Sequence, residues 1–335
     1  MSVLCLVEHD EQRPTGLSLQ ALTFARGLAE QVAAPVAAFL VDEPAPAVLT
    51  ALAAYGVAEV HAAAPDELKP YAARAWAAAI RQVAARLGAT TVVAAGSDRG
   101  HDVLAHLAAL ADLPLATMCV SATASGSGLA LTRLRWAGSL LEDCELSAPL
   151  ALLGIAPQVI SAEPAAQPGA ARVVRWRPEV SEHDLREQVA TSVTRDPGAV
   201  SLSDARVVVG GGRGVGGPEG FSTVEELAAL LDGTVGVSRV ATSLGWRSHR
   251  DQVGQTGTRI APELYLACGI SGAIQHMAGC KSAKRLLAVN TDPDAPIMKA
   301  ADYAVIGDLH QVLPELIKAL RGAASGKPEG PSAIG

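Results

Sequence analysis

The segment "LYLACGISGAIQHMAG", residues 264–279, decides the fold that we expect for this chain. Residues 264–268 form an apolar run that is typical of a buried strand, and a glycine-flanked serine leads from it into a helical pattern over 272–280. A strand that turns into a helix is the repeating unit of a parallel α/β sheet. The first backbone N–H groups of such a helix have no partner within it and suit a phosphate. The segment therefore predicts an α/β fold with an anion site, and His276 follows close behind that site.

The same alternation of apolar runs and helical patterns extends along the rest of the chain. We predict strands at residues 3–9, 35–41, 57–63, 90–96, 115–125, 129–136, 172–180, 205–210, 234–237, 263–268, 285–290 and 302–306. We predict helices at residues 18–33, 68–87, 99–111, 222–232, 238–244, 272–280 and 310–320. The pattern indicates two doubly wound, Rossmann-like α/β domains, at 1–194 and 195–322, joined through a polar linker at 191–204. Residues 323–335 contain too few apolar side chains to fold, so we expect a disordered tail there.

The composition argues against several classes of protein. The chain is acidic, with a formal net charge of −7, which disfavours a general nucleic-acid binder. Its five cysteines are widely spaced and form no C-x-x-C pair, so we expect buried thiols and neither a disulfide scaffold nor a zinc finger. The N-terminus lacks the basic region of a signal peptide, and no apolar run approaches the roughly 18 residues that span a bilayer. We therefore expect a soluble, cytoplasmic protein without membrane insertion.

A glycine-rich segment, "GGGRGVGG" at 210–217, contains G-x-G-x-x-G through Gly212, Gly214 and Gly217. Three interpretations are open: an NAD fingerprint, a loop that lets Arg213 approach a ligand, or a structural turn. The fingerprint is disfavoured, because the next helix is better capped at Ser222, with Glu225 completing a capping box. The acidic residue expected some twenty positions on also falls at a helix end and not at the tip of a strand.

Polar side chains follow each predicted strand of the C-terminal half. The carboxyl ends of parallel strands lie along one edge of a sheet, so these side chains are expected to line one crevice. They are Ser238 and Arg239, the loop residues Gln252, Gln255 and Thr256, Ser271 as N-cap with the free amides of Gly272, Ala273 and Ile274, then His276, Asn290 and Asp308. Each has an ordinary alternative, such as a surface ion pair for Arg239, a solvated loop at 251–265, or a core histidine. Together they suggest a nucleotide.

The sequence shows no motif that would supply its own chemistry. HExxH, GxSxG and G-x-x-x-x-G-K-[ST] are absent, the histidines are scattered, and no nucleophile–base pair can be proposed from spacing. Such a chain would depend on a bound cofactor for any redox reaction.

Two segments, "VGQTGTRIAPELYLACGISGAIQHMAG" (253–279) and "AVNTDPDAPIMKAADYAVIGDL" (288–309), closely resemble the α subunit of electron transfer flavoproteins, the family that includes the FixB proteins. The resemblance is looser across the N-terminal half, at "LVEHD" (6–10) and "TRLRWAG" (132–138). It implies that the C-terminal domain binds FAD and that the N-terminal domain serves subunit assembly without a cofactor. It also implies a heterodimer with an electron transfer flavoprotein β subunit that carries AMP.

The resemblance further implies a role in electron transport, as in fatty acid oxidation. Electron donors would be dehydrogenases such as acyl-CoA dehydrogenases, and the acceptor would be a membrane quinone oxidoreductase. The protein would be an electron carrier and not an enzyme. Two alternatives of other classes remain, an NAD-linked dehydrogenase with its own substrate and a nucleotide-binding subunit without redox activity.

Site roles follow from the resemblance residue by residue. Arg239 would lie against the flavin ring and favour negative charge on it, Thr256 would lie near N5, and His276 near the C2 carbonyl. Ser271 and the amides after it would hold the pyrophosphate. The complete expected set is Arg213, Ser238, Arg239, Gln252, Val253, Gly254, Gln255, Thr256, Ser271, Gly272, Ala273, Ile274, Gln275, His276, Asn290, Asp308 and Leu309. The chain departs from the family pattern in its glycine-rich segment, in the positive charge of "RSHRDQVGQTG" (247–257) and at 140–157.

Overall fold

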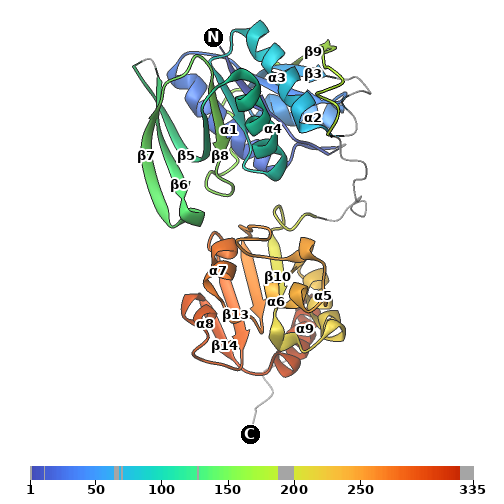
Figure 1. Cartoon of the computed structure of the whole chain (residues 1–335). Coiled ribbons are helices and arrows are strands. Elements are labelled where there is room, and N and C mark those ends of the chain that lie inside the picture. Colours follow the sequence, from blue (N-terminus) through green and yellow to red (C-terminus); the bar gives the residue numbers. More distant parts are fainter. Residues whose placement is uncertain are drawn as a thin grey trace. The chain divides into compact units, whose positions relative to one another are not determined.

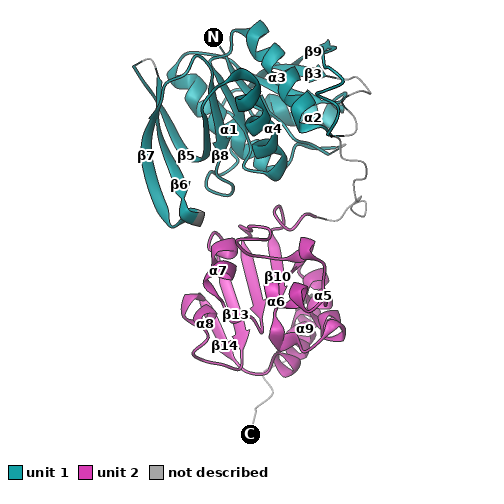
Figure 2. Cartoon of the chain, viewed as in Figure 1, with its two compact units in different colours: residues 1–194 teal, residues 195–335 magenta. Residues whose placement is uncertain are grey.

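The computed structural model describes residues 2–10, 12–63, 68, 71–126, 128–187 and 200–324. The chain divides into two compact units, Met1–Thr194 and Arg195–Gly335, which are described separately (Figure 2). Each unit is built around a sheet with parallel strands, which confirms the predicted α/β class. Most of the predicted linker and tail, 191–199 and 325–335, lies outside the described residues.

The first unit contains one large sheet with helices on both faces (Figure 1). Its strands are β1 (Val3–Leu6), β2 (Val36–Val41), β3 (Val57–Ala63), β4 (Thr91–Ala94), β5 (Leu115–Ser125), β6 (Gly128–Arg135), β7 (Leu140–Leu146), β8 (Ala151–Ile155) and β9 (Arg172–Trp176). Its helices are α1 (Gly16–Gln31), α2 (Pro46–Ala54), α3 (Ala73–Leu87) and α4 (Asp98–Ala111), with a short 3-10 turn at Trp136–Gly138. The strand order is β7-β6-β5-β8-β4-β1-β2-β3-β9, and only β5, β6 and β7 pair antiparallel.

The central strands of this sheet are buried on both sides, which explains their continuous apolar runs. In β1, Val3 and Cys5 face the side covered by α1 and α2, whereas Leu4 and Leu6 face α3 and α4. The Ala-rich α3 ends at Gly88, whose φ of 57° is the left-handed conformation that glycine adopts without strain. The chain leaves β1 toward β2 and β3 and then returns to β4 on the other side. The point between β1 and β4 is therefore a topological switch point.

Three elements of this unit escaped prediction. Helix α2 is short, β7 is an edge strand with mostly exposed side chains, and β8 is a short buried strand, "ALLGI". The predicted strand 172–180 is too long, because Pro178 cannot donate to a sheet ladder and β9 ends at Trp176.

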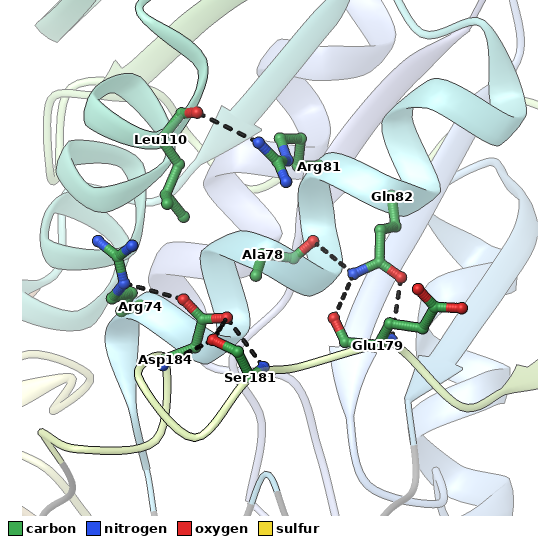
Figure 3. A network of polar contacts seen from close by, with 8 residues as sticks. All are labelled: Arg74, Ala78, Arg81, Gln82, Leu110, Glu179, Ser181 and Asp184. Atoms are coloured by element: carbon green, nitrogen blue, oxygen red, sulfur yellow. Dashed lines mark hydrogen bonds and ion pairs between the residues drawn. The ribbon is translucent and has the colours of Figure 1, made fainter.

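The residues after β9 pack along α3 (Figure 3). The Gln82 side chain donates to the Glu179 carbonyl at 2.7 Å and accepts from the Glu179 N–H at 3.0 Å. Asp184 accepts from Arg74 Nε at 2.8 Å and from the Ser181 hydroxyl at 2.7 Å. These bonds attach the segment up to residue 187 to the first unit.

The second unit has an all-parallel sheet in the order β11-β10-β12-β13-β14 (Figure 1). Its strands are β10 (Val207–Gly211), β11 (Thr234–Val237), β12 (Leu264–Cys268), β13 (Leu286–Asn290) and β14 (Tyr303–Ile306). Its helices are α5 (Phe221–Leu230), α6 (Arg239–Ser243), α7 (Ile274–Cys280), α8 (Pro296–Ala300) and α9 (Leu309–Ala324), with 3-10 turns at Arg213–Val215, Pro218–Gly220 and His249–Asp251. Helices α5 and α9 pack on one face, and α7 and α8 on the other. The switch point lies between β10 and β12.

Three boundary predictions in this unit are wrong. Ser222 does not cap α5: the helix begins at Phe221, which is buried, and the Ser222 hydroxyl donates to the Glu219 carbonyl. Glu225 pairs with Arg247 and completes no capping box.

The predicted tail starts too early, because α9 continues to Ala324. Arg321 in its last turn pairs with Glu226 of α5 at 2.8 Å. The predicted linker extends too far, because Ser201 and Leu202 are buried and Leu202 belongs to the core of the second unit. Helix α8 was not predicted.

Candidate functional site

A cavity of about 730 Å³ opens at the carboxyl ends of the strands of the second unit. All of the residues predicted for the site line it except Gly272 and Ile274. The cavity also takes in Gly214 of the glycine-rich segment and residues that the sequence did not single out: Val240, Ser243, Leu244, Gly269, Ile270, Thr291, Asp292, Ala295 and Gly307. The neighbouring strand ends bring these groups together, as the topology predicts.

The glycines of 210–217 mainly serve packing. A Cβ at Gly210 would lie 2.5 Å from Tyr265 Oη, and one at Gly212 would lie 2.3 Å from the Gly269 carbonyl oxygen. A dinucleotide fingerprint requires the helix to open at the glycines, but two 3-10 turns intervene before α5. Only Arg213 and Gly214 of this segment line the cavity. The structure therefore does not support the NAD interpretation. The segment 210–217 is a structural turn that also places Arg213 at the cavity.

Ser238 lies between β11 and α6, and Arg239 is the first residue of α6. The Ser238 N–H donates to the Gly211 carbonyl at 3.0 Å, which ties the start of α6 to β10. Its hydroxyl is buried and has no hydrogen-bond partner among the described residues. The Arg239 side chain is exposed and forms no ion pair with any described carboxylate, so the alternative of a surface ion pair finds no support. This corner offers an unused hydroxyl and a free cation to a ligand.

The loop at 252–256 is held by the Gln252 side chain. Gln252 is only 2% exposed, its Oε1 accepts from the Thr242 hydroxyl at 2.7 Å, and its Nε2 donates to Thr256 Oγ1 at 3.0 Å. The Gln255 N–H donates to the Gln275 carbonyl at 2.8 Å, which joins the loop to the start of α7. Gln255 and Thr256 are themselves exposed at the cavity. The loop is therefore an ordered wall and not simply a solvated connection.

The start of α7 differs from its prediction. Ser271 is not the N-cap: Ala273 takes that position, and α7 runs from Ile274. Gly272 adopts φ 77°, and a Cβ on it would lie 2.5 Å from the Ile297 backbone nitrogen. Gly272 thus packs against α8, and neither Gly272 nor Ile274, which is exposed, lines the cavity. Ser271 and Ala273 still line the cavity.

His276 lies in α7 and is 6% exposed. Its Nε2 is 2.8 Å from the hydroxyl of Tyr265, a fully buried residue of β12. Its Nδ1 has no hydrogen bond of normal geometry with a described residue. Burial lowers the pKa of His276 to about 4, and the backbone of Val253 opposes this shift only in part. The imidazole is therefore neutral at pH 7. Tyr265 was missed, although it is the one polar side chain within the apolar run "LYLAC".

Asn290 is the last residue of β13, and Asp308 follows β14. Asn290 Nδ2 donates to the Ile270 carbonyl at 2.9 Å, and its Oδ1 accepts from the Asp292 N–H at 3.0 Å. Asp308 Oδ1 accepts from the His310 N–H at 2.9 Å, at the start of α9. Both residues line the cavity while they hold the loops around it.

The donor set suits an anionic, polar ligand better than a metal. No described group of three or more His, Cys, Asp or Glu side chains could hold a metal ion. Two arginines at the cavity, and two buried polar atoms without partners, match a large ligand with negative charge and several hydrogen-bonding groups. Within the described part of the chain, no helix combines the length and the apolar character that a membrane span needs.

Comparison with known proteins identifies relatives along both units. Residues 3–181 match the electron transfer flavoprotein domain family, and residues 201–281 match the electron transfer flavoprotein FAD-binding domain family. The chain is 33% identical to the electron transfer flavoprotein subunit alpha of Thermoanaerobacterium thermosaccharolyticum, with 91% of this chain and 93% of the relative covered. Identity to the subunit alpha of Syntrophomonas wolfei is 35%, covering 94% and 98%. Protein FixB of Clostridium saccharobutylicum is 33% identical, covering 94% and 95%.

Proposed function

The chain belongs to the α-subunit family of electron transfer flavoproteins, and we propose that its second unit holds FAD in the cavity at the β10–β12 switch point. The observation that carries the proposal is the pair of buried polar atoms at this cavity, Ser238 Oγ and His276 Nδ1, which have no hydrogen bond of normal geometry to any described residue. Buried polar groups are nearly always hydrogen-bonded, so we expect each of these atoms to form a hydrogen bond with a ligand. The match of residues 201–281 to the FAD-binding domain family supports FAD as that ligand.

Bound FAD supplies the redox chemistry, and the chain's own residues bind and orient it. We assign charge compensation to Arg213 and Arg239, whose side chains are exposed at the cavity. Thr256 receives a hydrogen bond from Gln252, which leaves its own hydroxyl hydrogen available to a ligand. His276 offers a neutral polar contact. The family resemblance assigns Arg239, Thr256 and His276 to the flavin ring and Ser271 to the pyrophosphate. It assigns Ser238, Asn290 and Asp308 to the rest of the cofactor, with Asn290 and Asp308 toward the adenosine end.

The first unit and the partners complete the proposal. We assign residues 1–194 to assembly with a β subunit that carries AMP, and 195–322 to the cofactor. Three large apolar side chains at or near β7 are exposed: Trp136 at 81%, Leu140 at 54% and Leu141 at 69%. Exposed apolar patches often mark protein–protein interfaces, so these residues support an assembly role. Donors such as acyl-CoA dehydrogenases, a quinone oxidoreductase as acceptor, fatty acid oxidation and a cytoplasmic location belong to the same proposal. We assign the protein the role of a carrier, which the electron transfer flavoprotein names of its relatives support.

The absorbance spectrum of the purified complex tests the proposal, and FAD titration of variants locates the site. We expect flavin bands, with weaker FAD binding in Ser238→Ala and His276→Gln. Ser282→Ala is the matched control, since Ser282 is exposed and lies outside the cavity. A colourless complex that does not take up added FAD would contradict the proposal. Equal affinities in all three variants would place the flavin elsewhere.

A further inference from the structure

Tyr265 has an environment that the function proposed so far does not use. It is fully buried in β12, and its hydroxyl makes one hydrogen bond among the described residues, to His276 Nε2 at 2.8 Å. The two rings lie 6.0 Å apart between centroids, with an interplanar angle of 31°. Burial raises the pKa of the phenol well above its usual value, so the hydroxyl keeps its hydrogen at any physiological pH.

That hydrogen has one acceptor available. A buried hydroxyl hydrogen without an acceptor is costly, and His276 Nε2 can accept it only if this nitrogen carries no hydrogen of its own. A neutral imidazole has one ring N–H, so the hydrogen must then sit on Nδ1. His276 is neutral at pH 7, as described above. Nδ1 is also the ring atom without a hydrogen bond of normal geometry to a described residue, although the Val253 backbone lies near enough to act on the imidazole, and His276 lines the cavity.

We propose that Tyr265 is a positioning residue that holds His276 in the tautomer with hydrogen on Nδ1, so that this imidazole serves the cavity as an N–H donor. The ligand group that it recognises is a hydrogen-bond acceptor such as a carbonyl oxygen. The identity of that acceptor as part of FAD rests on the proposed function, whereas the tautomer does not.

The neighbouring strand supports this role for the phenol. Gly210 lies within β10, where glycine weakens a strand because it has no side chain to pack. A Cβ at this position would lie 2.5 Å from Tyr265 Oη and 2.7 Å from its Cε2. The glycine therefore leaves the space that the phenol occupies on its way to His276.

The tautomer can be read directly by nitrogen NMR of the full-length chain labelled with ¹⁵N-histidine. The His276 signals are identified by their loss in His276→Gln. We expect hydrogen on Nδ1 in the parent protein and a shift toward hydrogen on Nε2 in Tyr265→Phe. Tyr303→Phe is the control, because Tyr303 is 61% exposed in the edge strand β14 and outside the cavity. Hydrogen on Nε2 in the parent protein overturns the inference even if Tyr265→Phe does not fold. An unchanged Nδ1 tautomer in a folded Tyr265→Phe also overturns it.

FAD titration of the flavin-stripped complex tests whether the Nδ1–H of His276 donates a hydrogen bond to the ligand. We expect Tyr265→Phe to weaken FAD binding about five-fold, which corresponds to the loss of one neutral hydrogen bond, and Tyr303→Phe to leave it unchanged. Equal affinity despite an altered tautomer overturns the claim that Nδ1–H serves the ligand. If the parent complex binds no FAD at all, the proposed function fails while the NMR result still decides the tautomer.

Discussion

The two units share a topological feature but use it differently. In the first unit, the switch point between β1 and β4 is bridged by the protein itself: Glu8, just after β1, accepts a hydrogen bond from Ser97, just after β4. In the second unit, the switch point between β10 and β12 borders an open cavity lined by arginines and polar side chains. Topology thus marks where a ligand can bind, and the local side chains decide whether one is needed.

Two serines show the difference at the level of single atoms. Ser97 and Ser238 both have extended backbones at the N-cap of the helix that follows a strand. The Ser97 hydroxyl donates to Glu8 and accepts from the Gly100 N–H at 2.8 Å, so both of its partners come from the first unit itself. The Ser238 hydroxyl has no described partner. The second unit therefore presents a hydroxyl at its cavity that no described residue satisfies.

The two sites also differ in how burial shifts their titratable groups. Burial raises the pKa of Glu8, although hydrogen bonding to Ser97 and the charge of Arg99 oppose the shift. Burial lowers the pKa of His276 to about 4. Burial therefore shifts the titration of both groups toward their neutral forms, and the resulting pH dependences of stability have opposite signs.

Acidification should give the largest change in the free energy of unfolding, and its sign should differ between His276 in the second unit and Glu8 in the first. The unfolded state binds a proton on His276 near pH 6.5, whereas the folded state does so only near 4, so this residue costs stability as pH falls between those values. The loss is at most roughly 3 kcal/mol by pH 4. Glu8 acts in the other direction, since its raised pKa favours the folded state at low pH and that contribution is lost as pH rises. Denaturant unfolding at pH 7, 5.5 and 4 should show a smaller acid loss in His276→Gln than in the parent. Equal losses would mean that His276 is not buried in a neutral form.

Arg239→Ala should lower the first reduction potential of the bound flavin. A cation beside the ring stabilises the negative charge that reduction adds, and we expect about 2 kcal/mol after screening by solvent. For one electron this is about 90 mV. Arg239→Lys should be intermediate, because the charge remains but the planar group does not. The measurement is a spectroelectrochemical titration at full flavin occupancy.

Arg250→Ala serves as the control for that titration, because Arg250 is exposed and lies outside the cavity. Equal first reduction potentials in Arg239→Ala and Arg250→Ala would mean that the flavin ring does not lie beside Arg239 of α6.

Ser97→Ala should cause the smallest change, a loss of stability confined to the first unit. It removes the N-cap of α4 and leaves the Glu8 carboxylate without its hydroxyl partner, which together cost about 1.5 kcal/mol. The flavin content and potential should not change. Chemical denaturation measures the loss, with Ser139→Ala as a control at an exposed position of the same unit. A change in FAD affinity in Ser97→Ala would show that the two switch points are not independent.

Much of the second unit could be predicted from local patterns. Its five described strands fall where apolar runs predict them. The central strands β10, β12 and β13 are largely buried and therefore need continuous apolar sequence. The polar residues after those strands meet in one cavity, because parallel strands end at one edge. In the first unit β7 was missed, because an edge strand with exposed side chains carries a weak apolar signal.

The sequence by itself determined the α/β class, the strands of the second sheet and the residues gathered at its edge, because these depend on periodicity and chain order. Only the tertiary structure decided the roles of individual atoms. Gly272 packs on Ile297, α7 starts at Ile274 with Ala273 and not Ser271 as its N-cap, and Gly210 makes room for the hydroxyl of Tyr265. The hydroxyl of Ser97 is satisfied by Glu8, while that of Ser238 is left without a described partner. These outcomes depend on contacts between residues distant in the chain, which no local pattern encodes.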